Sequence, residues 1–306
     1  MVLSASFGSY PRPNFLREYQ IASYGKQKKI DHKYSQKDLD VMKKAVEEVV
    51  SDQKGLNIIT DGMLTWDDYL AHIASGFNGM EMGGLIRFYD NNTYYRRPAI
   101  TNDISGKKLL AGEMHKYVKT QDSKLKTVIP GPYTLYKLSE DKYYKDPAEA
   151  ISAITNALEA EIKALETDYI QIDEPSLSYG PDKDLTTQAI EAVNALCSKV
   201  EGKSIVATYF GDSSRVMDDL AEIKADYLGI DCVSFPQNYD ALLQSGIKNV
   251  QLGLLDARNT KIEEEAEVRK KMDAVDSDDI IISTNCGLEF LPRQYAKRKL
   301  DLLSRL

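Results

Sequence analysis

Eight short apolar segments recur along the chain, and most of them are separated by a segment with helical periodicity. Alternating strands and helices are typical of a parallel α/β fold, in which each helix packs back onto the sheet. Eight such strands in 306 residues match a (β/α)8 TIM barrel in number and length. We therefore predict an α/β TIM barrel. The expected strands are residues 2–7, 56–60, 127–129, 169–172, 204–209, 227–230, 249–254 and 279–283.

The segments between these strands carry helix signals. Ser35 is a predicted N-cap, because an amphipathic pattern follows it and Asp38 lies in the first turn. Residues 85–89 and 93–97 flank an Asp-Asn-Asn turn and predict a β-hairpin inserted at about 85–97. Because no linker or low-complexity segment interrupts the pattern, we expect a single domain, residues 1–306. The other expected helices are residues 14–24, 147–165, 186–200, 216–223, 239–245, 262–275 and 295–306.

The composition narrows the class of protein. A net charge of −8 argues against nucleic acid as the main partner. The three cysteines, Cys197, Cys232 and Cys286, are odd in number and widely spaced, which favours a reducing compartment over a disulfide framework. No apolar run reaches the roughly 18 residues of a membrane span, and no signal peptide is visible. We therefore expect a cytoplasmic protein with no membrane partner.

Two acids stand side by side after the fourth expected strand. Residues 169–172 are apolar except for Gln171, and Asp173, Glu174 and Pro175 follow. The proline ends the strand, so both carboxylates lie at its C-terminal end, where parallel barrels carry their chemistry. We predict Asp173 and Glu174 as catalytic residues. The structural alternative is that one of them caps the next element.

The case for a metal in this chain is weak. None of the three histidines, His32, His72 and His115, follows a strand in the second half of the chain, and we expect His72 to be structural. We therefore predict no bound metal; if there is one, Asp231 with the thiols of Cys232 and Cys286 would bind it. Buried small hydrophobic residues are the simpler interpretation of both thiols. The other residues expected at the same end of the barrel are Gly8, Ser9, Asp61, Thr208 and Tyr209.

Aromatic and basic residues near the strand ends are candidates for substrate binding. Trp66 follows the second expected strand, and Tyr209 ends the fifth. Arg12 and Arg17 follow the first strand, and guanidinium groups bind carboxylate or phosphate in a bidentate manner. Solvated surface charge is an equally good explanation of the arginines. No nucleophile elbow, P-loop, dinucleotide motif or catalytic triad is present in the sequence.

Several of these segments resemble cobalamin-independent methionine synthase. That family has two (β/α)8 barrels, a C-terminal one that binds zinc and homocysteine and an N-terminal one without zinc. The hairpin, the Thr-Tyr-Phe-Gly segment and an Arg-Asn pair are similar to the N-terminal barrel, so the chain resembles that barrel as a stand-alone protein. The matching segments are residues 8–12, 16–18, 88–95, 131–134, 171–175, 208–211, 253–259 and 283–286.

The chain departs from the zinc barrel of this family at the positions that matter for zinc. The family's His-x-Cys motif is replaced by Thr208 and Phe210, and its zinc-binding glutamate aligns near Asp231. The final thiol is kept as Cys286. Met63 stands where a family glutamate holds the homocysteine amine. The resemblance therefore implies that zinc is held by a partner chain rather than by this one.

The resemblance implies a methyltransferase of methionine biosynthesis. The chain would help to transfer a methyl group from a folate-type or other donor to homocysteine, as the zinc-free subunit of a two-chain enzyme. Gly8, Ser9 and Asp173 would shape the pocket. Arg12 and Arg17 match the segment that binds the folate tail, although Gln20 replaces a lysine there. Two alternatives remain: a non-catalytic binding or scaffold homologue, and an independent enzyme with Asp173 and Glu174 as acid and base.

Overall fold

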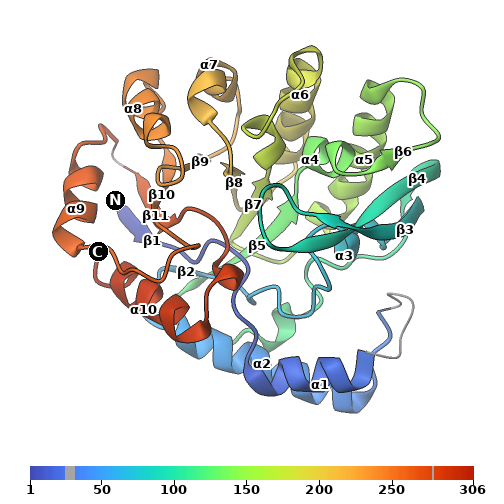
Figure 1. Ribbon diagram of the computed structural model, residues 1–306, viewed down its shortest axis with the longest axis horizontal. Helices are drawn as coiled ribbons and strands as arrows, with labels where there is room; N and C mark the ends of the chain where they lie inside the picture. Colours follow the sequence, from blue (N-terminus) through green and yellow to red (C-terminus); the bar gives the residue numbers. More distant parts are fainter. Residues whose placement is uncertain (25–31, 278) are drawn as a thin grey trace.

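The computed structural model of the chain describes residues 1–24, 32–277 and 279–306. Its parallel sheet has the order β1-β11-β10-β9-β8-β7-β5-β2, and a parallel bridge between Ala5 and Ile58 links the two edges into a nearly closed barrel (Figure 1). The predicted TIM barrel is confirmed. The barrel strands are β1 (Val2–Ser4), β2 (Ile58–Ile59), β5 (Lys124–Pro130), β7 (Tyr169–Asp173), β8 (Lys203–Thr208), β9 (Tyr227–Asp231), β10 (Val250–Leu255) and β11 (Ile280–Thr284).

Helices surround this barrel (Figure 1). The segment expected as one helix at 216–223 is instead a 3-10 turn, η4 (Ser213–Val216), followed by a short helix. No helix within the described ranges is both long and apolar enough to cross a membrane. The helices are α1 (Asn14–Tyr24), α2 (Gln36–Asp52), α3 (Ala71–Ala74), α4 (Pro132–Lys137), α5 (Pro147–Lys163), α6 (Thr186–Cys197), α7 (Met217–Leu220), α8 (Pro236–Ser245), α9 (Glu265–Asp273) and α10 (Arg293–Leu303).

Local sequence signals explain where the longest helices begin. Ser35 caps α2 as predicted: its hydroxyl accepts from the Asp38 N–H, and the Asp38 carboxylate accepts from the Ser35 N–H at 2.6 Å. This reciprocal capping box satisfies two donors that a helix start leaves unpaired. Asp146 caps α5 in a similar way by accepting from the Ala148 N–H at 2.9 Å, and Pro147 occupies the first helical position.

The inserted hairpin is longer than the sequence predicts. Its strands are β3 (Phe77–Arg87) and β4 (Tyr94–Gly106), and β6 (Glu140–Asp141) pairs with β4 to complete a small separate sheet. The sequence predicts only the half next to the turn, where apolar segments directly flank clear turn residues. The far half contains glycine and polar residues, so its strand signal is weak. The hairpin tip reaches the mouth of the barrel, where Phe88 is buried.

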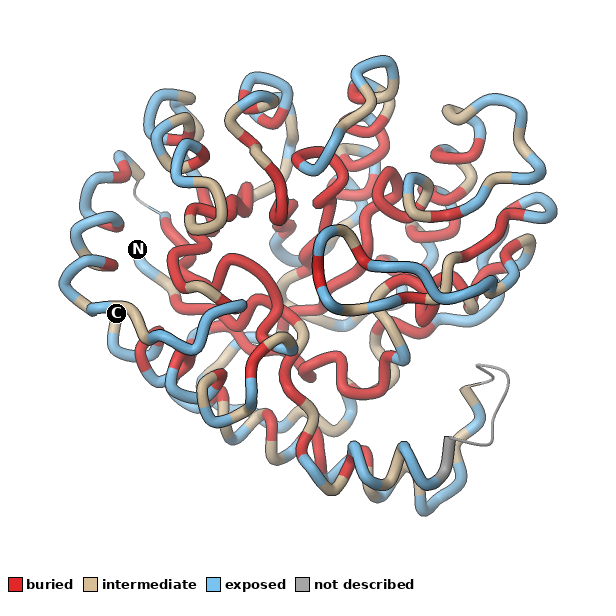
Figure 2. The backbone as a smooth tube through the Cα atoms, in the orientation of Figure 1, coloured by how far each residue is buried: buried red, intermediate tan, exposed pale blue. Residues whose placement is uncertain are grey.

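Buried residues line the barrel strands and the inner faces of the helices (Figure 2). One apolar cluster, which includes Ile58, Ile205 and Ile281, joins residues from separate strands and is distinct from the main core. A polar layer also crosses the barrel, because the Lys126 ammonium donates to the Gln171 side chain at 2.5 Å, and Gln251 donates to the same oxygen at 3.3 Å. The barrel interior is therefore not purely apolar.

Candidate active site at the mouth of the barrel

A cavity of about 730 Å³ opens at the C-terminal ends of the barrel strands. A smaller cavity of about 20 Å³ is lined by several of the same residues and also by Asp173 and Tyr209. The walls of the larger cavity come from the segments after β1 and β2, from the hairpin tip and from the segment after β11. Among the residues that line it are Ser9, Arg12, Arg17, Met63, Trp66, Tyr69, Phe88, Glu289 and Arg293.

Asp173 ends β7 and lies at the narrow part of this mouth. Its Oδ1 accepts from the Gln171 amide at 2.7 Å and its Oδ2 accepts from the Tyr209 hydroxyl at 2.9 Å. Burial raises the pKa of Asp173 to about 7, although the hydrogen bonds from Gln171 and Tyr209 act in the opposite direction. The carboxyl is thus poised to exchange a proton or accept a cation near neutral pH.

Glu174 follows Asp173 in the chain but has a different environment. Its Oε1 accepts from the Tyr133 N–H at 3.0 Å and its Oε2 accepts from the Thr134 N–H at 2.8 Å, at the start of α4. A side chain at Gly131 would collide with Glu174, since an added Cβ would lie 2.2 Å from its carboxyl carbon. Glu174 therefore binds the N-terminal N–H groups of α4, a neighbouring helix. It does not cap the element that follows it in the chain.

Glu289 is a site residue that the sequence analysis missed. It lies in the 3-10 turn η5 (Leu288–Phe290) after β11, lines both cavities and accepts a hydrogen bond from the Ser9 hydroxyl. Its side chain is open to the cavity, while the surrounding protein raises its pKa through desolvation. The available signal was an acid three residues beyond Cys286, in the segment that follows the last strand.

Tyrosine and phenylalanine rings line the smaller cavity together with Ser9. The Tyr69 hydroxyl is buried beside Asp173 and lowers the pKa of that carboxyl, yet it has no hydrogen-bond partner of normal geometry among the described residues.

Met63 and Phe210 both have positive φ angles, 53° and 68°. Left-handed backbone is costly for side chains of this kind, so the two positions are held by the surrounding structure. They place a thioether and a ring at the small cavity.

Arg12 and Arg17 both line the larger cavity. Arg12 donates from Nε to the Leu64 carbonyl at 3.0 Å and also to the Trp66 carbonyl, so it fixes the loop after β2. Arg17 is exposed and contacts Asn14 at 3.5 Å. Both line the cavity together with Arg293, which is already paired with Glu48 and Asp52. The carboxylates of Asp67, Asp68 and Glu289 line the same cavity, so its wall carries charges of both signs. Gly8 and Ser9 line the smaller cavity.

The fold and this site define a TIM-barrel protein with its ligand pocket at the C-terminal ends of the strands. Residues 2–305 match the family model described as cobalamin-independent synthase, catalytic domain, and the chain belongs to that family. The resemblance inferred from the sequence is thereby confirmed at the level of the family. The matching model is that of the catalytic domain, whereas the sequence motifs were most similar to the zinc-free barrel.

Known relatives agree with this assignment. The chain is 28% identical over 306 residues to a methionine synthase from Sulfolobus acidocaldarius, with 96% of this chain and 87% of the relative covered. It is 30% identical over 310 residues to a methionine synthase from Saccharolobus solfataricus, with 96% and 90% covered. The alignments therefore extend over most of both proteins.

Solved structures share the fold. A B12-independent methionine synthase from Shewanella sp. W3-18-1, solved in complex with selenomethionine, superposes with a TM-score of 0.82 at 22% identity, covering 98% of this chain and 95% of that one. A methyltransferase from Methanosarcina mazei has a TM-score of 0.60 at 11% identity, covering 98% and 93%. At these identities the likeness supports the barrel fold alone.

The residues at the family's zinc position do not suit zinc in this chain. The Thr208 hydroxyl pairs with Ser213 at 3.2 Å, and the Phe210 ring offers no donor atom. Among the described residues, Asp231, Cys232 and Cys286 do not bring three donor atoms within 4.8 Å of one another. We therefore derive no step through zinc at this position.

Proposed function

We propose that this chain binds homocysteine or its methylated product at the mouth of the barrel and contributes to methyl transfer between a methyl donor and that amino acid. Membership of the family supports the reaction class. The observation that carries the proposal is the pair of carboxylates, Asp173 and Glu289, that line one cavity beside Ser9. Two acids in a desolvated mouth favour a cationic group such as an α-ammonium.

The bound-ligand chemistry of a structural neighbour fits this assignment. The Shewanella protein was solved with selenomethionine, an amino acid with a soft thioether-like selenium. In this chain, the aromatic rings of Tyr69 and Phe88 line the larger cavity with the Met63 thioether. Such a wall suits an apolar sulfur-containing side chain, since sulfur packs favourably against aromatic rings.

We further propose that thiol activation comes from a partner chain that carries zinc. Thr208 and Phe210 provide no thiolate or imidazole at the relevant position, so this chain has no evident means of its own to stabilise a homocysteine thiolate. Arg12 and the exposed Arg17, which both line the larger cavity, would hold an anionic methyl donor of the folate type.

A non-catalytic binding or scaffold role is the second candidate, and the absence of a thiolate or imidazole at positions 208 and 210 favours it. The third candidate, an independent acid–base enzyme using Asp173 and Glu174, has less support. Both oxygens of Glu174 accept N–H groups of α4, which leaves this carboxylate little freedom to act on a substrate.

The test combines binding with turnover. Trp66 is the single tryptophan of the chain and lines the cavity, so its fluorescence reports ligand binding directly. We expect methionine and homocysteine to change this signal, and we expect methylation of homocysteine only when a zinc-carrying barrel of the same family is added. Binding without any effect on the partner's turnover would support the scaffold role. Methylation by the purified chain alone would contradict the need for a partner.

A further inference from the structure

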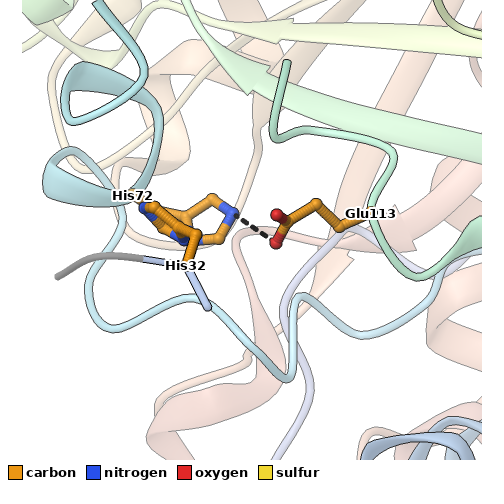
Figure 3. A group of neighbouring side chains, drawn as sticks. All are labelled: His32, His72 and Glu113. Atoms are coloured by element: carbon orange, nitrogen blue, oxygen red, sulfur yellow. Dashed lines mark ion pairs between the residues drawn. The ribbon is translucent and has the colours of Figure 1, made fainter. Parts of the chain in front are cut away.

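Two histidines and a glutamate meet behind the wall of the cavity, outside the site described above. His32 precedes α2, His72 lies in α3, and Glu113 lies between β4 and the 3-10 turn η1 (His115–Tyr117). One potential ligand atom from each residue lies within 4.8 Å of the other two. Figure 3 shows the two imidazole rings against each other, with the Glu113 carboxylate facing them. No other group of this kind occurs in the part of the chain that the structure describes.

His72 is tightly packed, but its ring nitrogens make few hydrogen bonds. It is fully buried and stacks on the Trp66 ring, with centroids 4.7 Å apart and an angle of 11°. Its Nε2 lies 3.4 Å from the Leu110 carbonyl, a long contact, and its Nδ1 has no partner among the described residues. A buried imidazole with so little hydrogen bonding marks a place where an ion or water completes the environment.

The two imidazole rings are held next to each other by their surroundings. The His32 ring packs edge-on against His72 at 4.8 Å and is oriented by the Ser75 hydroxyl, 2.7 Å from its Nε2.

Negative charge is available beside the two rings. The Glu113 Oε2 lies 4.0 Å from the His72 Nε2, and the pKa of Glu113 is raised by burial. Glu161 is buried close by, with its carboxylate accepting from the Leu110 and Ala111 N–H groups. A cation among these groups would gain from both carboxylates.

Lys108 is the cation that would compete with a metal ion for Glu113. Its ammonium lies 3.3 Å from the Glu113 Oε1 and 3.0 Å from the His32 carbonyl, and its side chain is 44% exposed. Lys108 and Arg12 both lower the pKa of His72, so positive charge already acts on the ring. Because the lysine side chain is long and partly solvated, it can leave Glu113 for water when a stronger cation arrives.

We propose that His32, His72 and Glu113 form a binding site for a divalent transition metal of the zinc type. Two imidazoles and a carboxylate are a donor set that zinc uses, with a water molecule in the fourth position. Tetrahedral donors about 2.1 Å from the metal lie about 3.4 Å apart, so a small rotation of Glu113 completes the geometry. The metal would join three separate chain segments and support Trp66 from behind.

The experiment uses the full-length protein without a histidine tag, stripped with a chelator. Because Trp66 stacks directly on His72, Co²⁺ bound there should quench the fluorescence of the only tryptophan. We expect one Co²⁺ per chain, displaced by Zn²⁺. Glu113→Gln and His32→Gln should each weaken Co²⁺ binding by at least about 100-fold, since each removes one ligand. His115→Gln, the matched control at the third histidine, should leave the affinity unchanged.

A further variant separates a metal site from a structural ion pair. Lys108→Gln removes the competing cation, so it should tighten Co²⁺ binding by about tenfold. It remains informative even where Glu113→Gln fails to fold. Absence of Co²⁺ binding by the wild-type protein, or weaker binding by Lys108→Gln, would overturn the proposal. The result is independent of the proposed function, because Co²⁺ binding should persist in Asp173→Asn, which removes a group of the barrel mouth.

Discussion

Asp173 and Glu174 are neighbours in the chain, but they belong to two regions with different kinds of contact. Asp173 lies in the barrel interior, where its hydrogen-bond partners are the side chains of Gln171 and Tyr209. Glu174 lies in the outer layer, where its partners are backbone N–H groups of α4. Successive side chains of a strand point to opposite faces, which explains the separation.

The difference shows what each region can do. Side-chain partners can turn to make room for a ligand, so a carboxylate in the barrel interior can exchange them for a substrate group. The backbone donors at a helix start are fixed by the helix, so the carboxylate that accepts them is committed to structure. One acid of the pair is suited to binding and the other to holding the fold.

The largest effect is expected at Glu174. Glu174→Ala leaves the Tyr133 and Thr134 N–H groups buried without acceptors, at a cost of about 2 kcal/mol each. We therefore expect the free energy of unfolding to fall by about 4 kcal/mol in urea denaturation. Glu166→Ala, an exposed glutamate, serves as the control and should change little. A small change in the Glu174 variant would show that α4 does not depend on this carboxylate.

Asp173→Asn tests the opposite side of the comparison. The variant keeps the shape of the side chain but removes the charge, so affinity for methionine should fall by about 3 kcal/mol, on the order of 100-fold. The Trp66 fluorescence titration measures this loss. Thermal unfolding should be nearly unchanged, because side-chain partners adjust to an amide. A large loss of stability with unchanged affinity would mean that Asp173 holds the fold and does not bind the ligand.

Ligand affinity should depend on pH through Asp173. With a pKa of about 7, this carboxyl is largely protonated at pH 6 and largely ionised at pH 8. An ammonium ligand prefers the ionised form, so affinity should rise by about tenfold from pH 6 to pH 8. Asp173→Asn should remove this dependence. A flat profile in the wild-type protein would mean that the carboxyl does not control binding.

The stability of the ligand-free protein should fall as the pH rises, whereas the ligand affinity should increase. Burial raises the pKa of both Asp173 and Glu174 to about 7 in the folded state. A raised pKa favours the folded state below the unfolded value near 4, and this contribution is lost as the pH rises through 7. Urea denaturation measured from pH 4 to pH 8 should therefore show that the free energy of unfolding declines as the pH rises. Glu174→Gln should make this decline smaller. An unchanged slope in this variant would exclude Glu174 as its source.

The smallest effect is expected at Lys126, which belongs to the same interior network as Asp173. Burial lowers the pKa of Lys126 to about 7, which means that its charge is costly there. Lys126→Met should raise the free energy of unfolding by about 1 kcal/mol at pH 7. The Gln171 oxygen keeps one donor, because the Gln251 amide already donates to it at 3.3 Å, while the Gln251 oxygen loses the Lys126 ammonium, 3.4 Å away. A destabilised variant would show that the ammonium is an essential partner of the layer.

Much of the fold was predictable from local patterns. The apolar strands, the capping box at Ser35 and the strand end at Asp173 all depend on residues close together in the chain. The hairpin was recovered in part, because its far strand halves lack a clear apolar alternation. Glu289 and the His32–His72–Glu113 group were not predicted, since each depends on contacts between segments far apart in the sequence.

The sequence by itself determined the barrel, its family and the acidic end of β7, because periodicity and short motifs are local properties of the chain. Tertiary structure decided which of two adjacent carboxylates faces the cavity and which holds α4. It also placed Glu289 beside Ser9, which lies 280 positions away. The physical reason is that barrel closure brings strand ends together regardless of their separation, while the pleat of a strand directs neighbouring side chains apart.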